Sequence, residues 1–190
     1  MVWLSQWLVL WVAVEAALAG STQHCPQKIL KTDFNMTEYL GEWNEILRVP
    51  NDYEEGYSCM SDRFRLSPDG ATKVHSHAYN ASNGAYVFLD GVVTLSQPGR
   101  FDITYSGETV WSSSYWVLGT NYNTYAVLWG CLVQNDGSIR HLSWVSSRQK
   151  TLDEDSMTEV NEVLGNNGLE RSQYEDVVQT NCPAMPSAEL

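Results

Sequence analysis

Short apolar or alternating runs recur about every ten residues along this chain, and turn residues separate them. Two of the turns have a clear physical basis. In Pro68-Asp69-Gly70 the proline ring fixes φ and the glycine accepts a positive φ, so the segment favours a turn. Asn83-Gly84 is a strong hairpin sequence. This rhythm is typical of an all-β domain. The eight predicted strands cover residues 43–49, 60–66, 73–79, 86–95, 101–105, 115–118, 125–133 and 139–146.

Eight antiparallel strands in sequence most simply close into an up-and-down β-barrel, because closure leaves no unpaired strand edge. After the last strand, apolar residues recur at helical spacing between Leu152 and Leu164. An acidic first turn at 153–155 suits the positive end of the helix dipole, and Gly168 ends the helix. An eight-stranded interior holds only side chains or one small ligand, so we expect this single C-terminal α-helix to pack outside.

The N-terminal segment 1–19 has the features of a secretory signal peptide. Its apolar run 7–14 is too short to span a bilayer, and Ala17-Leu18-Ala19 is a small-residue cleavage site. We expect cleavage there, or one residue later after Gly20, which leaves 20–190 as a single secreted domain with no transmembrane anchor. No Lys or Arg precedes the apolar run, so an N-terminal anchor or a buried helix is the alternative.

Four cysteines follow the predicted signal peptide, and none stands in a C-x-x-C pair. An even number of scattered cysteines in a secreted chain indicates two disulfides. Four cysteines allow three pairings, and counting does not choose among them. No His stands at zinc-finger spacing, so we expect no metal site. The cysteines are Cys25, Cys59, Cys131 and Cys182.

The surface of the protein is expected to be acidic and glycosylated. Eleven Lys and Arg residues against 23 Asp and Glu give a formal net charge of −12. Nucleic acids and anionic membranes are therefore excluded as partners, because they require a cationic surface. Asn35 and Asn80 each begin an N-x-S/T sequence, which in a secreted chain predicts N-glycosylation.

No arrangement of residues suggests catalysis. The chain has no G-x-S-x-G, no H-E-x-x-H and no glycine-rich phosphate loop. Its carboxylates are spread along the chain, mostly near turns and on the predicted helix, which favours solvated surface charge. His75 and His77 share a face of one predicted strand, but no third ligand accompanies them. We therefore expect no enzyme activity and no required cofactor.

Three motifs in order resemble those of the lipocalin family. Gly41 and Trp43, within 39–46, resemble the G-x-W motif that opens the lipocalin barrel. Thr120 and Tyr122 resemble the second motif, usually T-D-Y, although Asn121 replaces the usual Asp. Arg148 resembles the third motif, a lone Arg after the last strand. The resemblance is strongest to the apolipoprotein D group, with its insect and fish bilin-binding relatives, and it covers about residues 25–185.

The resemblance implies contacts that the residues alone leave open. In the family the lone Arg packs over the first-motif Trp at the closed end of the barrel, which here places Arg148 on Trp43. The disulfide pairing of the apolipoprotein D group carries over as Cys25–Cys131 and Cys59–Cys182. Both disulfides would tie terminal segments to the barrel wall.

The resemblance also implies a ligand pocket inside the barrel, with an apolar and aromatic lining and a few hydroxyls. Arg140 shares strand parity with two of the lining residues, and its charge would suit a fatty-acid carboxylate or a bilin propionate. The alternative for Arg140 is a side chain that leans into solvent near a turn. The expected lining residues are Phe64, Ser76, Tyr86, Phe88, Leu142 and Trp144.

The function implied is that of a secreted lipocalin that carries a small hydrophobic ligand. The ligand classes are bilin pigment, fatty acid or other lipid, sterol, retinoid and carotenoid. One alternative is an occluded barrel that acts through its outer surface, through a homo-oligomer interface or on a cell-surface receptor. Another is a lipocalin enzyme such as an isomerase, which would need a reactive thiol, whereas all four cysteines are assigned to disulfides.

Overall fold

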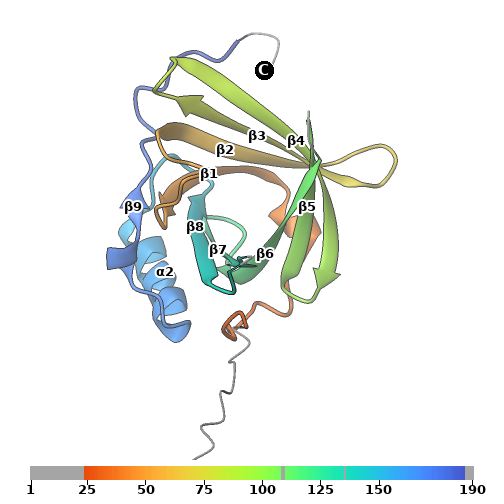
Figure 1. Cartoon of the computed structure of the whole chain (residues 1–190), viewed down its shortest axis with the longest axis vertical. Coiled ribbons are helices and arrows are strands. Elements are labelled where there is room, and N and C mark those ends of the chain that lie inside the picture. The colour runs from red at the N-terminus through yellow and green to blue at the C-terminus, as the bar shows by residue number, and fades with distance from the viewer. Residues whose placement is uncertain (1–23, 108–109, 135, 187–190) are drawn as a thin grey trace, which may run out of the picture.

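The computed structural model describes residues 24–107, 110–134 and 136–186, so the predicted signal peptide lies outside the described residues. A nine-stranded antiparallel sheet curls into a barrel with one longer helix on its outside (Figure 1). Within the described ranges, no helix is long and apolar enough to cross a membrane. The elements are α1 (Met36–Tyr39), β1 (Gly41–Arg48), β2 (Tyr57–Leu66), β3 (Thr72–Asn80), β4 (Ala85–Gln97), β5 (Arg100–Ser106), β6 (Trp111–Thr120), β7 (Tyr125–Val133), β8 (Ile139–Ser147), α2 (Glu154–Asn166), the 3₁₀-helix η1 (Arg171–Gln173) and β9 (Glu175–Asp176).

The predicted eight-stranded antiparallel barrel is confirmed. Strands β2 to β8 pair in sequence order, and β1 closes the circle by pairing with both β2 and β8. Residues 41–44 of β1 pair with β2, and residues 44–48 pair with β8, with a bulge between Glu45 and Leu47. The two-residue β9, which the sequence did not suggest, pairs with the end of β1.

The predicted helix α2 packs outside the barrel, as expected. Its buried residues Val160 and Leu164 lie in a second apolar core against the outer faces of β6, β7 and β8. These strands therefore bury both faces, which explains the uninterrupted burial of residues 125–130 and 142–147. Asp153 caps the helix by accepting a hydrogen bond from the Ser156 backbone N–H at 2.7 Å.

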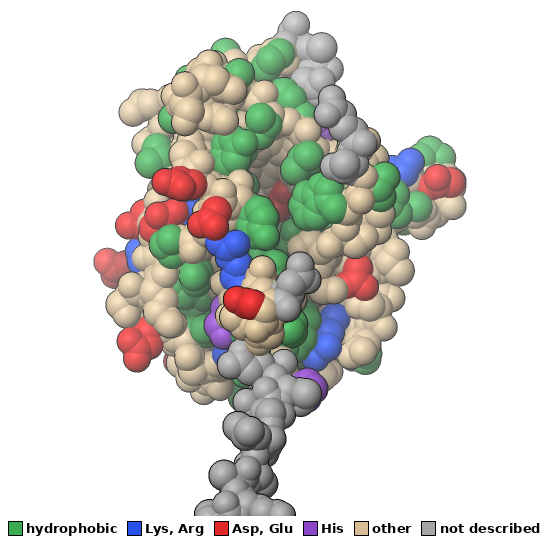
Figure 2. Space-filling model, viewed as in Figure 1, with side chains coloured by type: hydrophobic (Ala, Val, Ile, Leu, Met, Phe, Trp, Pro, Cys, Tyr) green, Lys and Arg blue, Asp and Glu red, His purple; other side chains and the backbone are tan. Residues whose placement is uncertain are grey.

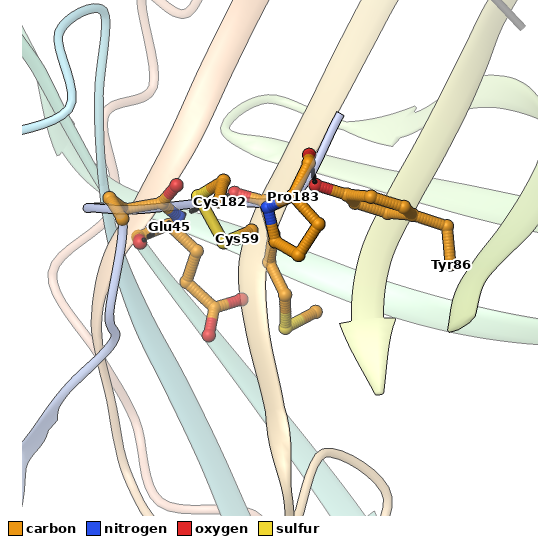
Figure 3. Close-up of a disulfide and its surroundings, with 7 residues drawn as sticks. Glu45, Cys59, Tyr86, Cys182 and Pro183 are labelled. Carbon is orange, nitrogen blue, oxygen red and sulfur yellow. Dashed lines mark hydrogen bonds between the residues drawn. A yellow bond between two sulfur atoms is a disulfide. The ribbon is translucent and has the colours of Figure 1, made fainter. Parts of the chain in front are cut away.

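Both disulfides tie a terminal segment to the barrel. Cys25 is bonded to Cys131 on β7, and Cys59 on β2 is bonded to Cys182, so the pairing implied by the lipocalin resemblance is correct. Figure 3 shows the C-terminal tail crossing beside β2, where the Tyr86 hydroxyl also donates to the Pro183 carbonyl at 2.7 Å. The bonds close loops of 106 and 123 residues, for which chain entropy contributes a few kcal/mol each, about 3–5 kcal/mol.

The close packing of α2 against the barrel depends on Gly119 in β6. A Cβ atom on Gly119 would lie 2.7 Å from Cγ2 of Val163. Gly119→Ala should therefore push the helix away and lower the free energy of unfolding by about 1–3 kcal/mol, as measured by urea denaturation with disulfides intact. Gly165→Ala is the matched control, because nothing lies within 4 Å of its Cβ position. That variant should be neutral or more stable by ~0.5–1 kcal/mol, and equal losses in both variants would contradict the packing argument.

Candidate functional site

One end of the barrel is sealed by an arginine on a tryptophan. The Arg148 guanidinium lies 3.7 Å from the ring centroid of Trp43, which is itself 1% exposed. Arg148 also donates to the carbonyls of Glu42 and Tyr122, both at 2.9 Å. Gly41 has a φ of +103°, and a Cβ there would meet Arg148 Nη1 at 3.0 Å. The contact implied by the resemblance is present, and it leaves the opposite end of the barrel as the route to the interior.

The second motif builds the turn between β6 and β7 and does not face the interior. Thr120 Oγ1 donates to the Tyr125 carbonyl at 2.6 Å and accepts from the Tyr122 backbone N–H at 2.9 Å. Asn121 Oδ1 accepts from the backbone N–H of Thr124 at 2.9 Å, so the amide can organise the turn where the family usually has Asp. The positions Thr120 and Tyr122 are therefore structural.

Aromatic side chains fill the sealed half of the interior. Phe64 is 2% exposed, and its ring centroid lies 5.1 Å from that of Tyr39 and 6.1 Å from that of Phe101. Tyr39 in turn stacks on Trp43 at 4.9 Å. Phe64 points inward as predicted, but it belongs to this packed floor.

Above the floor the inner wall is polar as well as aromatic. Ser76 points inward, as predicted, and its hydroxyl donates to Oδ1 of Asp62 at 2.5 Å. The hydroxyls of Tyr105 and Tyr115 lie 3.1 Å apart, and the Tyr115 ring lies 5.4 Å from that of Trp144. Leu142 and Trp144 belong to the inner core, in agreement with their predicted positions.

Figure 2 shows the hollow that these strands surround. Hydrophobic side chains border it, and an acidic side chain is visible within it. In the same view, Figure 1 shows the strands of the barrel circling this position. The interior is therefore filled at its sealed end and hollow toward the other end.

Two residues that were predicted to line the pocket, Tyr86 and Phe88, lie on the outer face of the barrel. In the register of β3 with β4, His77 is paired with Phe88 and Tyr79 with Tyr86, so these side chains share the outer face. The ring centroids of Phe88 and His75 are 5.8 Å apart on that face. The prediction that Tyr86 and Phe88 line the interior is wrong.

The inner face of β4 is formed by the alternate residues. A Cβ atom on Gly91 would lie 2.5 Å from the Ile103 side chain and 3.1 Å from that of Val74, both of which belong to the inner core. Residues 86–89 are four consecutive apolar residues, so strand alternation carries no information there about which face is inner.

Arg140 lies at the rim and is engaged there. Its guanidinium contacts the Asp52 carboxylate at 2.7 Å and lies 5.0 Å from the ring centroid of Tyr53. Both partners belong to the loop between β1 and β2. The structure thus places this cation at the start of β8, held against the β1–β2 loop beside a surface depression, and not on the inner wall. The depression is lined by Asp52, Gln134, Asp136, Ser138, Ile139 and Arg140.

Carboxylates on the inner wall escaped the sequence interpretation, which placed acids on the solvated surface. Asp62 stands opposite Trp43 in the β1–β2 ladder and shares the inner face with Phe64. Burial raises its pKa to about 6, against the lowering effect of the Ser76 hydrogen bond. Glu45 is 8% exposed, and burial holds its pKa well above the ordinary value. The sequence could have indicated this position, because Asp62 is two residues from the inward Phe64 on the same strand and therefore shares its face.

A third carboxylate, that of Glu54, reaches the inner wall from the loop between β1 and β2. Glu54 accepts a forked hydrogen bond from Nε1 of Trp144, at 3.1 and 3.0 Å to its two oxygens. Asn51 Nδ2 holds the same carboxylate at 2.6 Å. The loop thereby fixes the orientation of the inward Trp144 ring.

Neither the histidines nor the acids form a metal centre in the described ranges. His75 and His77 project from the outer face of β3, and His75 Nδ1 lies 2.9 Å from an Asp90 oxygen. Within these ranges no three His, Cys, Asp or Glu side chains are grouped so that they could hold a metal ion.

Comparison with known proteins agrees with this architecture. A model of the Lipocalin / cytosolic fatty-acid binding protein family matches residues 40–181. Apolipoprotein D of Cavia porcellus is 26% identical over 164 residues, which cover 84% of either chain. The structure of the major allergen Per a 4 from cockroaches is 36% identical with a TM-score of 0.73, covering 83% of this chain and 96% of that one. Insecticyanin from the tobacco hornworm Manduca sexta is 21% identical with a TM-score of 0.78, covering 86% and 90%.

The buried Asp62 carboxylate should lower stability at neutral pH. Its pKa of about 6 exceeds the ordinary 3.8, so the folded state binds the proton more tightly than the unfolded chain. The free energy of unfolding is therefore lowered by the full amount above pH 6, and this loss becomes smaller as the pH falls toward 4. Asp62→Asn should therefore raise the free energy of unfolding by on the order of 1–3 kcal/mol near neutral pH and by much less at pH 4.

Denaturant titrations of wild type and variant at the two pH values, with disulfides intact, measure this difference. Asp33→Asn is the control, because its side chain is 82% exposed and its ion pair with Lys31 should contribute little. An effect of Asp62→Asn that is the same at both pH values would show that the carboxyl has an ordinary pKa.

Proposed function

We propose that this chain, which belongs to the lipocalin family, is a secreted protein that binds a small hydrophobic ligand inside its barrel. Binding is reversible burial and involves no catalytic step. The observation that carries the proposal is the hollow between the sealed aromatic floor and the open end, bordered by hydrophobic side chains (Figure 2). A concave apolar surface with a few polar groups binds by removing ligand area from water, and its polar groups orient the ligand.

Aromatic rings supply the main contact surface. Tyr115 and Trp144 provide this surface, and their row continues from the fully buried Phe101 of the floor, with successive ring centroids 5.4 Å apart. Such a row suits a flat or elongated hydrophobe, because stacking adds to the gain from buried area. The ligand classes that fit this description include bilins, lipids, sterols, retinoids and carotenoids.

Secretion is supported by the predicted signal peptide and by the two disulfides, which persist in oxidising compartments. The two predicted glycosylation sites lie on the surface. Asn35 is exposed at the start of α1, and Asn80 is half-buried at the end of β3. We propose that both Asn35 and Asn80 carry glycans.

The carrier proposal is tested by what accompanies the protein from its native source. An absorption spectrum followed by organic extraction and mass spectrometry should reveal a bound hydrophobe, and a bilin would give a blue-green colour. If nothing is extracted and a panel of fluorescent hydrophobes also fails to bind, the barrel is occluded and acts through its outer surface.

The pocket assignment is tested by a pair of aromatic substitutions on opposite faces of the wall. Trp144→Ala should weaken binding of a fluorescent hydrophobe by about tenfold, because it removes an inner stacking surface. Phe88→Ala is the matched control, since its ring lies on the outer face, and it should leave affinity unchanged. Equal effects of the two variants, each verified as folded by circular dichroism, would contradict this assignment.

A further inference from the structure

Among the described residues, the inner wall of the barrel carries more carboxyl groups than cations. Asp62 and Glu45 come from adjacent strands, and Glu54 comes from the loop that joins those strands. Arg48, the buried cation nearest to them along β1, is already engaged, with Nε 2.6 Å from Glu175 and Nη1 3.5 Å from Glu45. Arg48 also donates to the Tyr57 carbonyl at 3.0 Å. Within the described ranges, Arg48 is thus shared between two carboxylates, whereas the hydrogen-bond partners of the Asp62 and Glu54 carboxylates are neutral groups.

Asp62 is the clearest of these carboxylates. Within the part of the chain that the structure describes, its side-chain hydrogen-bond partner is the neutral hydroxyl of Ser76. Its burial is not complete, because some of its surface remains accessible to solvent. An inner-wall carboxylate with accessible surface and a neutral partner is open to a ligand in the hollow.

Glu45 provides an independent observation. Its side chain is among the buried ones, and its Oε1 makes no hydrogen bond within the described residues, its contact there being the long ion pair with Arg48 Nη1 at 3.5 Å. It shares the inner face of β1 with Trp43, because the two residues alternate with Asn44. Figure 3 shows its carboxylate pointing away from the disulfide of Cys59 and from the C-terminal tail. A buried carboxylate oxygen with no hydrogen bond and only a long ion pair gains from a further donor.

We propose that the ligand of this barrel is a hydrophobic cation, namely a protonated amine carried on a flat aromatic body. The ammonium group lies against Asp62 on the acidic wall, and the aromatic body packs against the adjoining rings of Tyr115 and Trp144. This inference rests on the proposed function, because it names the chemical class of ligand for the same barrel.

The charges on the inner wall favour a protonated amine over a fatty acid or a neutral hydrophobe. An ammonium group donates to carboxylates that have left bulk water, and charge-assisted hydrogen bonds of this kind are among the strong ones. A fatty acid would bring a further carboxylate to a wall where Arg48 is occupied and where Arg140 is held at the rim by Asp52. A neutral hydrophobe gains from burial alone.

The charge state of Asp62 also sets the direction of the pH dependence. A cation binds the ionised carboxyl, so its affinity should fall as the pH drops below about 6, by up to tenfold per pH unit. An anionic ligand should show the opposite trend. Over the residues that the structure describes, the titratable groups that interact electrostatically with Asp62 are acids and phenols from four helices or strands and one loop, namely Tyr39 (α1), Glu45 (β1), Glu54 (the β1–β2 loop), Tyr105 (β5) and Tyr115 (β6).

Three indoles of matched size test the proposal by calorimetric titration of the full mature protein. They are tryptamine, neutral 3-ethylindole and anionic indole-3-propionate. Tryptamine should bind about 10- to 100-fold more tightly than 3-ethylindole at pH 7.5, and indole-3-propionate should bind most weakly. If 3-ethylindole or the anion binds as tightly as tryptamine, the inference fails and the carrier function stands. If none of the three binds and native protein yields no hydrophobe, the proposed function itself fails.

The residue assignment is tested with Asp62→Asn, which keeps the oxygen that accepts from Ser76 and removes the charge. This variant should lose at least about tenfold in tryptamine affinity and less than twofold in 3-ethylindole affinity. Asp90→Asn, on the outer face opposite His75, is the control and should change neither. If Asp62→Asn does not fold, the pH dependence of the wild type decides. Tryptamine binding that is unchanged between pH 7.5 and pH 5 overturns the proposal.

Discussion

The interior of this molecule exists because one strand, β1, pairs on both sides. Its first half pairs with β2 and its second half with β8, so the sheet has no free edge between them. Trp43 precedes Asn44, the residue at which the two pairings meet, and Arg148 covers Trp43 from the sealed end. Without this closure, the residues that now face the hollow would form one half-buried face of an open sheet in contact with water.

Closure of the barrel raises the free-energy cost of each charge on the inner wall, because it removes that charge from bulk water. An aspartate in the middle of an exposed strand costs little, but the same residue on the inner wall leaves bulk water. The protein accommodates part of this cost through Ser76 beside Asp62 and through Arg48 beside Glu45. The remaining negative charge is what a cationic ligand would neutralise, and ligand that binds only the folded state adds to its stability.

The candidate site could be predicted in part. Phe64, Ser76, Leu142 and Trp144 face inward as expected, because the lipocalin motifs set the strand order around them. The prediction failed for β4, where apolar residues occupy both faces, since the outer face of this strand carries an aromatic cluster with β3. A run that is apolar at every position has no period, so only the register with a neighbouring strand assigns its faces.

The sequence by itself determined the eight strands, the outer helix, the lipocalin motifs and, through the family resemblance, the disulfide pairing. These features depend on local periodicity, on turn residues and on short motifs, all of which are properties of neighbouring positions. The tertiary structure alone decided which face of β4 is inner, that Arg140 is held at the rim by Asp52, and that Asp62, Glu45 and Glu54 come from different segments to one wall. Those outcomes depend on strand register and on the electrostatics of a closed interior, where the cost of each charge depends on neighbours that are distant in the chain.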